Sequence, residues 1–167
     1  MYTLRYISSY SQQVKDQVHE LIEKDNLADY LLNKYTTTHE FVNDKLLREY
    51  AVAIKNQYIK KSSPLSQVIY DPKIHVINNA LGLHTIVSRV QGNKLKSKNE
   101  IRISDIFRKS PEPFLRMIVV HELAHLKEKD HNKAFYKLCC HMSSDYHQLE
   151  LDMRLYLIQL AINGEIY

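Results

Sequence analysis

The chain has 167 residues, of which 44% are hydrophobic and 25% are charged, and its formal net charge is +4. This length supports one hydrophobic core and the composition excludes a disordered or low-complexity chain, so we expect a single domain over residues 1–167. The mild positive charge permits contact with phosphate or acidic surfaces, but it does not indicate a dedicated nucleic-acid-binding protein.

Residues 1–63 are predicted to form helices. Val14, Val18 and Leu21 recur at helical spacing, and residues 37–40, Thr-Thr-His-Glu, have the pattern of a capping box that opens a further helix. The N-terminus lacks the apolar run of a signal peptide, and no stretch approaches the roughly 20 apolar residues that cross a membrane. We therefore expect a cytoplasmic protein without membrane contact.

Residues 64–109 are predicted to form a small, mainly antiparallel sheet. Their β-branched residues partly alternate with polar ones, which is typical of strands. Turn-forming pairs such as Asn78-Asn79 and Gly92-Asn93 separate the strands. The predicted strands include residues 68–70, 74–77, 83–90 and 101–103. An edge strand of such a sheet could pair with an extended substrate.

Residues 110–167 are predicted to be helical. The segment Ser110-Pro-Glu-Pro113 starts a helix, because the hydroxyl can cap it and the prolines fall where no backbone donor is needed. The residues that follow are apolar on nearly every face, so this helix is predicted to be buried. Asp130 and Ser144 are placed to open two more helices. Helices on both sides of a small sheet segment assign the chain to the α+β class.

The pentapeptide His121-Glu-Leu-Ala-His125 lies in that buried helix. Imidazoles one helical turn apart converge on one point, as a tetrahedral metal ion requires, so His121 and His125 are candidate zinc ligands. Glu122 lies beside that point, where a carboxylate can take a proton from a water that the metal has made more acidic. The alternative is two hydrogen-bonded core histidines with Glu122 in a buried ion pair, and burying such groups is costly.

A zinc site needs a third ligand, and His131 is the nearest candidate. It follows His125 after Leu-Lys-Glu-Lys-Asp, which is long enough to end the helix and fold back. Glu150 is a rival, because a helix-borne carboxylate about 25 residues after the histidine pair is an alternative arrangement. Other rivals are His141, His147 and Asp152, whereas His19 and His39 are expected at the surface.

Residues 117–135, Met-Ile-Val-Val-His-Glu-Leu-Ala-His-Leu-Lys-Glu-Lys-Asp-His-Asn-Lys-Ala-Phe, resemble the YgjP-like family of small bacterial zinc metallohydrolases. Residues 74–84, 88–92 and 113–116 are also similar to that family, so the resemblance covers nearly the whole chain. It implies a minimal zincin fold, related in pattern to SprT-type metalloproteases, with the metal-binding helix under a small sheet. It also implies that His131 is the third ligand.

The resemblance implies hydrolysis without fixing the bond that is cleaved, because a nucleotide pyrophosphatase activity is also proposed within the family. The longer metzincin signature has the same histidine spacing but a Gly where this chain has Glu128, and no Met-turn is evident. The chain is therefore not assigned to the metzincins.

The most basic stretch of the chain runs from Arg89 to Lys109. A solvated loop is its ordinary interpretation, and binding of phosphate groups or weak contact with nucleic acid are alternatives. Its cations are Arg89, Lys94, Lys96, Lys98, Arg102, Arg108 and Lys109. His84 and Tyr136 are candidates to stabilise an oxyanion, although either residue type is more often packed or exposed without such a role.

Together, these patterns predict a zincin-like metallohydrolase domain that binds zinc through His121, His125 and His131. Peptide hydrolysis with Glu122 as the general base is the favoured function, and the substrate is then a protein or peptide. The first alternative is a zinc-dependent nucleoside triphosphate pyrophosphatase, whose basic stretch would bind the phosphates. The second is a metal-stabilised binding module without turnover, which a fourth protein ligand would favour. Nothing in the sequence indicates an oligomeric state.

Overall fold

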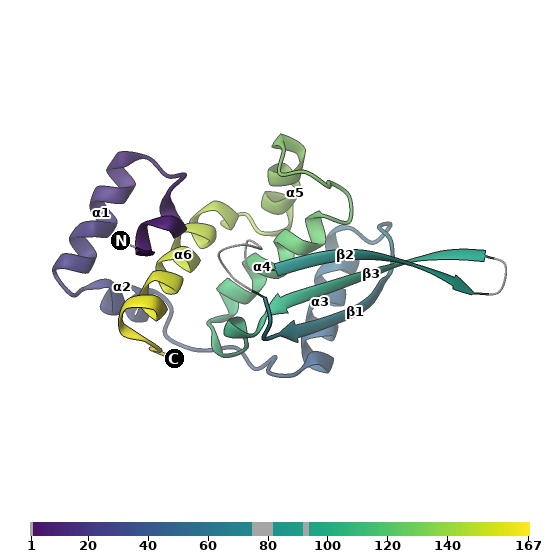
Figure 1. Ribbon diagram of the computed structural model, residues 1–167, viewed down its shortest axis with the longest axis horizontal. Coiled ribbons are helices and arrows are strands. Elements are labelled where there is room, and N and C mark those ends of the chain that lie inside the picture. The colour runs from purple at the N-terminus through teal and green to yellow at the C-terminus, as the bar shows by residue number, and fades with distance from the viewer. Residues whose placement is uncertain (1, 75–81, 92–93) are drawn as a thin grey trace.

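The computed structural model describes the backbone of residues 2–74, 82–91 and 94–167 and the side chains of residues 5–74 and 99–167 (Figure 1). The turns expected at Asn78-Asn79 and Gly92-Asn93 lie outside these ranges, as does most of the strand expected at 74–77. The elements in chain order are η1 Tyr2–Ile7, α1 Gln12–Glu23, α2 Leu27–Lys34, α3 Asp44–Tyr58, β1 Leu65–Asp71, β2 Gly82–Gln91, β3 Lys94–Ser104, η2 Asp105–Lys109, α4 Glu112–Ala124, α5 Lys133–Met142 and α6 Tyr146–Asn163. The predicted α+β class is confirmed.

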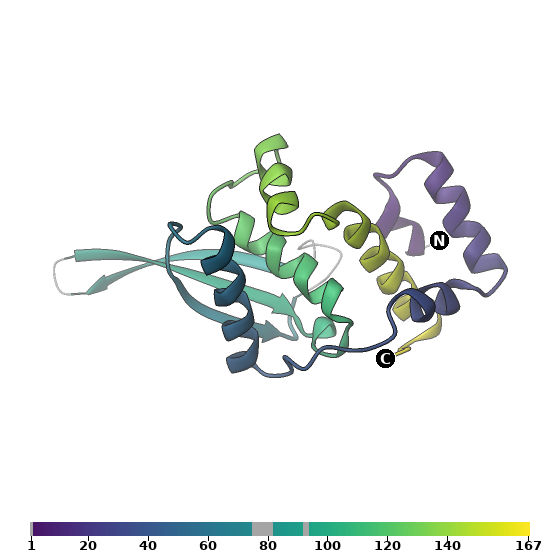
Figure 2. The ribbon, with the colours of Figure 1, turned by 180° about the vertical axis from the view of Figure 1, so that it is seen from behind.

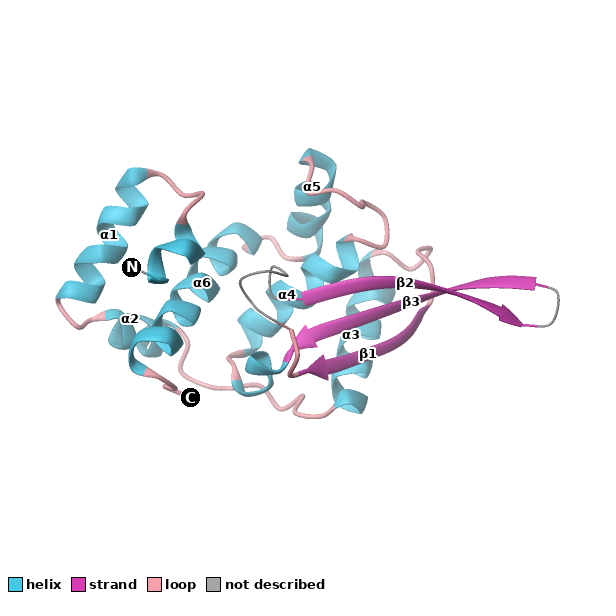
Figure 3. Ribbon diagram, viewed as in Figure 1, coloured by secondary structure: helices cyan, strands magenta, loops and turns pink. Residues whose placement is uncertain are grey.

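The sheet has the strand order β1-β3-β2 (Figure 3). β2 and β3 form the expected antiparallel hairpin, in register from Gly82 opposite Ile103 to Gln91 opposite Lys94. β1 pairs with β3 in parallel, from Leu65 beside Asn99 onward, so the antiparallel prediction is wrong for this strand. The reason is topological, because the chain crosses from β1 to the far edge before β3 returns between the two.

Two helices, α3 and α5, begin at asparagine caps that lie a few residues after the predicted starts. The Asn43 side chain accepts a hydrogen bond from the Leu46 amide at 2.9 Å, so α3 begins at Asp44 and not after the expected capping box at 37–40. Asn132 caps α5 in the same way through the Phe135 amide, at 2.9 Å. In both cases an Asn oxygen satisfies an amide that the helix itself leaves unpaired.

α4 is the central helix of the fold. It lies with α3 against one face of the sheet, and α5 and α6 pack around it (Figure 2). Ten of its 13 residues are buried, which leaves it almost no solvent-exposed face and confirms the burial predicted from the sequence. Apolar side chains such as Leu115, Ile118 and Val119 are fully buried there. Two polar residues of its last turn, His121 and Glu122, are buried with them.

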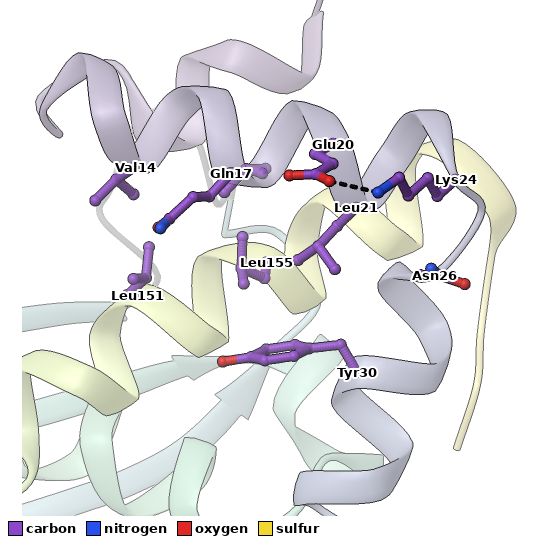
Figure 4. Close-up of a pocket in the computed structure, with 10 residues that line it drawn as sticks. Val14, Gln17, Glu20, Leu21, Lys24, Asn26, Tyr30, Leu151 and Leu155 are labelled. Atoms are coloured by element: carbon purple, nitrogen blue, oxygen red, sulfur yellow. Dashed lines mark hydrogen bonds and ion pairs between the residues drawn. The ribbon is translucent and has the colours of Figure 1, made fainter.

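The N-terminal helices are attached to α6 through a buried carboxylate. Asp152 is fully buried and accepts hydrogen bonds from Lys34 Nζ at 2.7 Å, Tyr30 Oη at 3.0 Å and Tyr35 Oη at 2.5 Å. A groove of about 440 Å³ lies between α1, α2 and α6, and Figure 4 shows Leu21 among the side chains that line it. Within the described ranges, no helix combines the length and apolar character that crossing a membrane requires.

Candidate metal centre

Three histidine side chains converge where α4 ends. His121 lies in the last turn of α4, His125 is the residue that ends it, and His131 comes from the loop before α5. The Nε2 atom of His131 lies 3.2 Å from His121 Nε2 and 3.1 Å from His125 Nε2. The structure thus brings together the three residues that the sequence nominated as ligands.

The spacing of these nitrogens fits a bound metal ion. A tetrahedral zinc ion with Zn–N distances of about 2.0–2.1 Å holds neighbouring nitrogens about 3.3–3.4 Å apart. The observed separations of 3.1 and 3.2 Å are close to that value. In the part of the chain whose side chains are described, the group contains these three histidines and no fourth His, Cys, Asp or Glu. The triad could therefore hold a metal ion and leave one coordination position open.

Hydrogen bonds at the opposite ring nitrogens orient two of the imidazoles. His121 Nδ1 lies 2.8 Å from Tyr146 Oη, and His125 Nδ1 lies 3.0 Å from the Glu128 carbonyl oxygen. A ring that donates from Nδ1 presents its Nε2 lone pair to the metal, as ligating histidines commonly do. The Phe135 ring contacts all three imidazoles, at centroid distances of 4.9, 4.6 and 4.9 Å to His121, His125 and His131.

The surroundings of the histidines favour their neutral form. Burial, with the nearby His125 and His131, lowers the pKa of His121 to about 3. Burial also lowers the pKa of His125. Because a metal binds only the deprotonated nitrogen, these shifts leave lone pairs free for an ion near neutral pH.

Glu122 follows His121 on α4 and is only 2% exposed. Burial raises the pKa of its carboxyl group to about 8. Among residues with described side chains, Glu122 forms no ion pair, so the alternative reading of this residue as half of a buried ion pair finds no support there. A buried carboxyl group with a raised pKa, adjacent in sequence to a candidate metal ligand, is suited to proton transfer.

The rival ligands have other partners. Glu150 pairs with Arg154 at 3.2 Å, and Asp152 binds the N-terminal helices as described above. The ring of His141 lies edge-on to that of Tyr58, and the ring of His147 lies 5.6 Å from that of Tyr136 in a tilted arrangement. None of these rivals belongs to the group of side chains that converges on the triad.

One histidine lies where the sequence analysis did not expect it. His19 is exposed as expected, but His39 is buried, so its surface assignment is wrong. Its Nε2 lies 2.7 Å from the Phe107 carbonyl oxygen, and its Nδ1 accepts a hydrogen bond from the Phe41 amide at 3.0 Å. His39 therefore connects the segment before α3 to η2.

The basic stretch is only partly described. Arg102 pairs with Asp71 at 3.1 Å and Arg108 with Asp105 at 2.7 Å, so both cations have partners within the fold. Lys109 is exposed. The side chains of Arg89, Lys94, Lys96 and Lys98 lie outside the described residues, and so does the oxyanion candidate His84. The other candidate, Tyr136, is half-buried with its ring 6.5 Å from that of His131.

Tyr146 is the residue at this centre that sequence reasoning missed. It begins α6 and is fully buried, 25 residues from the histidine that it contacts. No local pattern marks such a contact, because only the packing of α6 against α4 creates it.

Comparisons with known proteins find a family and a named protein to which the chain is similar. The sequence model of the YgjP-like family, described as a metallopeptidase domain, matches residues 8–155. The chain is 57% identical over 162 residues to a protein of Escherichia coli (strain K12) named UTP pyrophosphatase, and the match covers 97% of each chain. No solved structure matches the chain significantly.

Proposed function

Because the chain belongs to the YgjP-like family, we propose that it is a zinc-dependent hydrolase that cleaves a nucleoside triphosphate such as UTP to the monophosphate and pyrophosphate. The observation that supports this substrate is the 57% identity, over 97% of both chains, to a protein named UTP pyrophosphatase. The sequence alone favoured peptide hydrolysis and kept this reaction as its first alternative. The comparison supports the alternative better.

The three histidines would hold the zinc ion. Bound there, zinc would act as a Lewis acid toward a phosphate oxygen and raise the acidity of water. Three protein ligands are the usual number in catalytic zinc sites, whereas structural sites are closed by a fourth. The absence of a fourth ligand among the described side chains therefore favours catalysis over a binding module without turnover.

Glu122 would act as the general base. Its carboxylate would accept a proton from the water that attacks the α-phosphorus while the bond to the bridging oxygen breaks. The same proton can then pass to the pyrophosphate that leaves, so one residue serves both transfers. The apolar residues that surround Glu122 on α4 keep it out of bulk water, which strengthens its interactions with charged reactants.

Peptide hydrolysis is the second candidate function. The matching family is described as a metallopeptidase domain, and the same triad and carboxylate could activate water toward a peptide carbonyl. The two functions differ in the bond broken and share the proposed zinc ligands and base. Both functions are therefore compatible with the geometry of the triad, and an assay with each substrate is needed to separate them.

A side-by-side assay separates the candidates. Zinc-loaded protein is incubated with each of the four nucleoside triphosphates and, separately, with an unfolded protein substrate. We expect UMP and pyrophosphate in equal amounts from UTP, and no peptide fragments. Fragments that depend on Glu122, with intact UTP, would replace the proposed function by the peptidase alternative. The Glu122→Gln variant is the control for contaminating hydrolases in both arms.

A further inference from the structure

A buried hydrogen bond leads away from the triad. The Nδ1 atom of His121 lies 2.8 Å from the hydroxyl of Tyr146. His121 comes from α4 and Tyr146 from α6, and the exposed fractions of both residues are below one tenth. The contact therefore joins two of the helices that surround the centre.

The donor and acceptor of this contact follow from the two ring nitrogens of His121. Its Nε2 lies 3.2 Å from His131 Nε2, within the group of atoms that could hold the ion, and a metal-ligating nitrogen carries no proton. The proton of the neutral ring is then on Nδ1, which donates to the Tyr146 hydroxyl, because a tyrosine hydroxyl has lone pairs with which to accept.

A second contact fixes Tyr146 relative to α4. Arg116, five residues before His121 on α4, donates from Nη1 to Ser143 Oγ at 2.7 Å and to Asp145 Oδ1 at 3.1 Å. These two residues form the turn that precedes Tyr146, at the start of α6. The turn is thus attached to the same helix that carries His121, and the tyrosine hydroxyl has little freedom to move away from the imidazole.

We propose that Tyr146 is a positioning residue of the metal centre, which holds His121 in the ligating tautomer and is itself held in place by the bonds of Arg116 to the preceding turn. The inference rests on the proposed metal site and adds a residue that the histidine motif does not contain. Orienting partners of this kind stabilise metal binding by keeping the ligand ring in place before the ion arrives. Removing the hydroxyl while keeping the ring should therefore weaken zinc binding more than it weakens the fold.

The test compares zinc affinities by competition with a chromogenic chelator, which does not depend on activity. We expect Tyr146→Phe to bind zinc about 10-fold or more weakly than the wild type. The matched control is Tyr70→Phe, which also removes a buried hydroxyl hydrogen bond, the one to the Phe41 carbonyl oxygen at 2.6 Å, in a residue outside the triad. This control should keep wild-type affinity. Equal affinities for Tyr146→Phe and wild type, or equal losses in both variants, would overturn the proposal.

A variant of Arg116 tests the same contact if Tyr146→Phe does not fold without metal. Arg116→Ala removes the bonds to Ser143 and Asp145 that hold the turn before Tyr146, so it should weaken zinc binding several-fold. The matched control, Arg108→Ala, removes the pair with Asp105 and should leave zinc affinity unchanged. Identical affinities for these two variants would count against the proposal. Failure of the wild-type protein to bind zinc would instead refute the metal site itself, so the two failures can be told apart.

Discussion

Replacing Glu122 by Gln should stabilise the metal-free protein while it destroys catalysis. The amide keeps the volume of the side chain but cannot ionise, so it removes the cost of burying a charge. Glu122 is 2% exposed, and burial raises its pKa from 4.5 to about 8. The folded, metal-free protein therefore keeps a proton on this group that the unfolded chain loses above pH 4.5, whereas a bound zinc cation would favour the ionised carboxylate that a general base requires.

The sign and size of the effect follow from that difference. Well below pH 4.5 both states carry the proton, and Glu122 costs nothing. As the pH rises toward 8 only the unfolded state ionises, so the free energy of unfolding of the wild type falls by up to about 1.4 kcal/mol per pH unit relative to the Gln variant. Between pH 5 and pH 8 the variant should gain about 3 kcal/mol over the wild type.

Urea unfolding in the presence of a chelator measures this difference. Unfolding curves at pH 5, 6, 7 and 8 give the unfolding free energy of each protein at each pH. The difference between variant and wild type at each pH cancels the contribution of groups that titrate equally in both proteins. A gap that widens with pH supports the buried, unpaired carboxyl group. A gap that stays constant from pH 5 to pH 8 would show that Glu122 is solvated or paired, and the reasoning would be refuted.

Other predictions concern the metal ligands, the substrate and the buried Asp152 that attaches the N-terminal helices. Replacing His131 by Ala should remove most of the zinc, measured by elemental analysis, and retained zinc would require another third ligand. The substrate prediction concerns four basic residues, Lys94, Lys96, Lys98 and Arg102. If they bind phosphates, neutralising them should raise the KM for UTP several-fold at unchanged zinc content. An unchanged KM would show that they are solvated surface residues. Asp152→Ala should lower stability by about 3 kcal/mol in urea unfolding, because Lys34 and two tyrosine hydroxyls lose their acceptor, yet zinc affinity should not change.

The histidine triad could be predicted because its information is local. His121 and His125 are one helical turn apart, and His131 follows after a short loop, so spacing alone indicates convergence. Apolar residues around them indicate burial of α4 in the same way. Tyr146 could not be predicted, because its contact with His121 depends on how α6 packs against α4.

The parts of the fold that were predicted less well also depend on non-local contacts. The parallel pairing of β1 with β3 follows from the path of the chain between strands, which alternation in the sequence does not encode. His39 looked like a surface residue because its partner, the Phe107 carbonyl, lies 68 residues away. Substrate is the least predictable property, since one metal centre serves several kinds of bond.

Zinc titration of the metal-free protein with UTP present tests the central claim most directly. The account predicts that UMP and pyrophosphate form at a rate that rises with added zinc and levels off at about one zinc per chain, the capacity of a single three-histidine site. The Glu122→Gln protein should bind the same zinc and release neither product. UTP hydrolysis that needs no zinc, or that persists in the Glu122→Gln protein, would contradict the account.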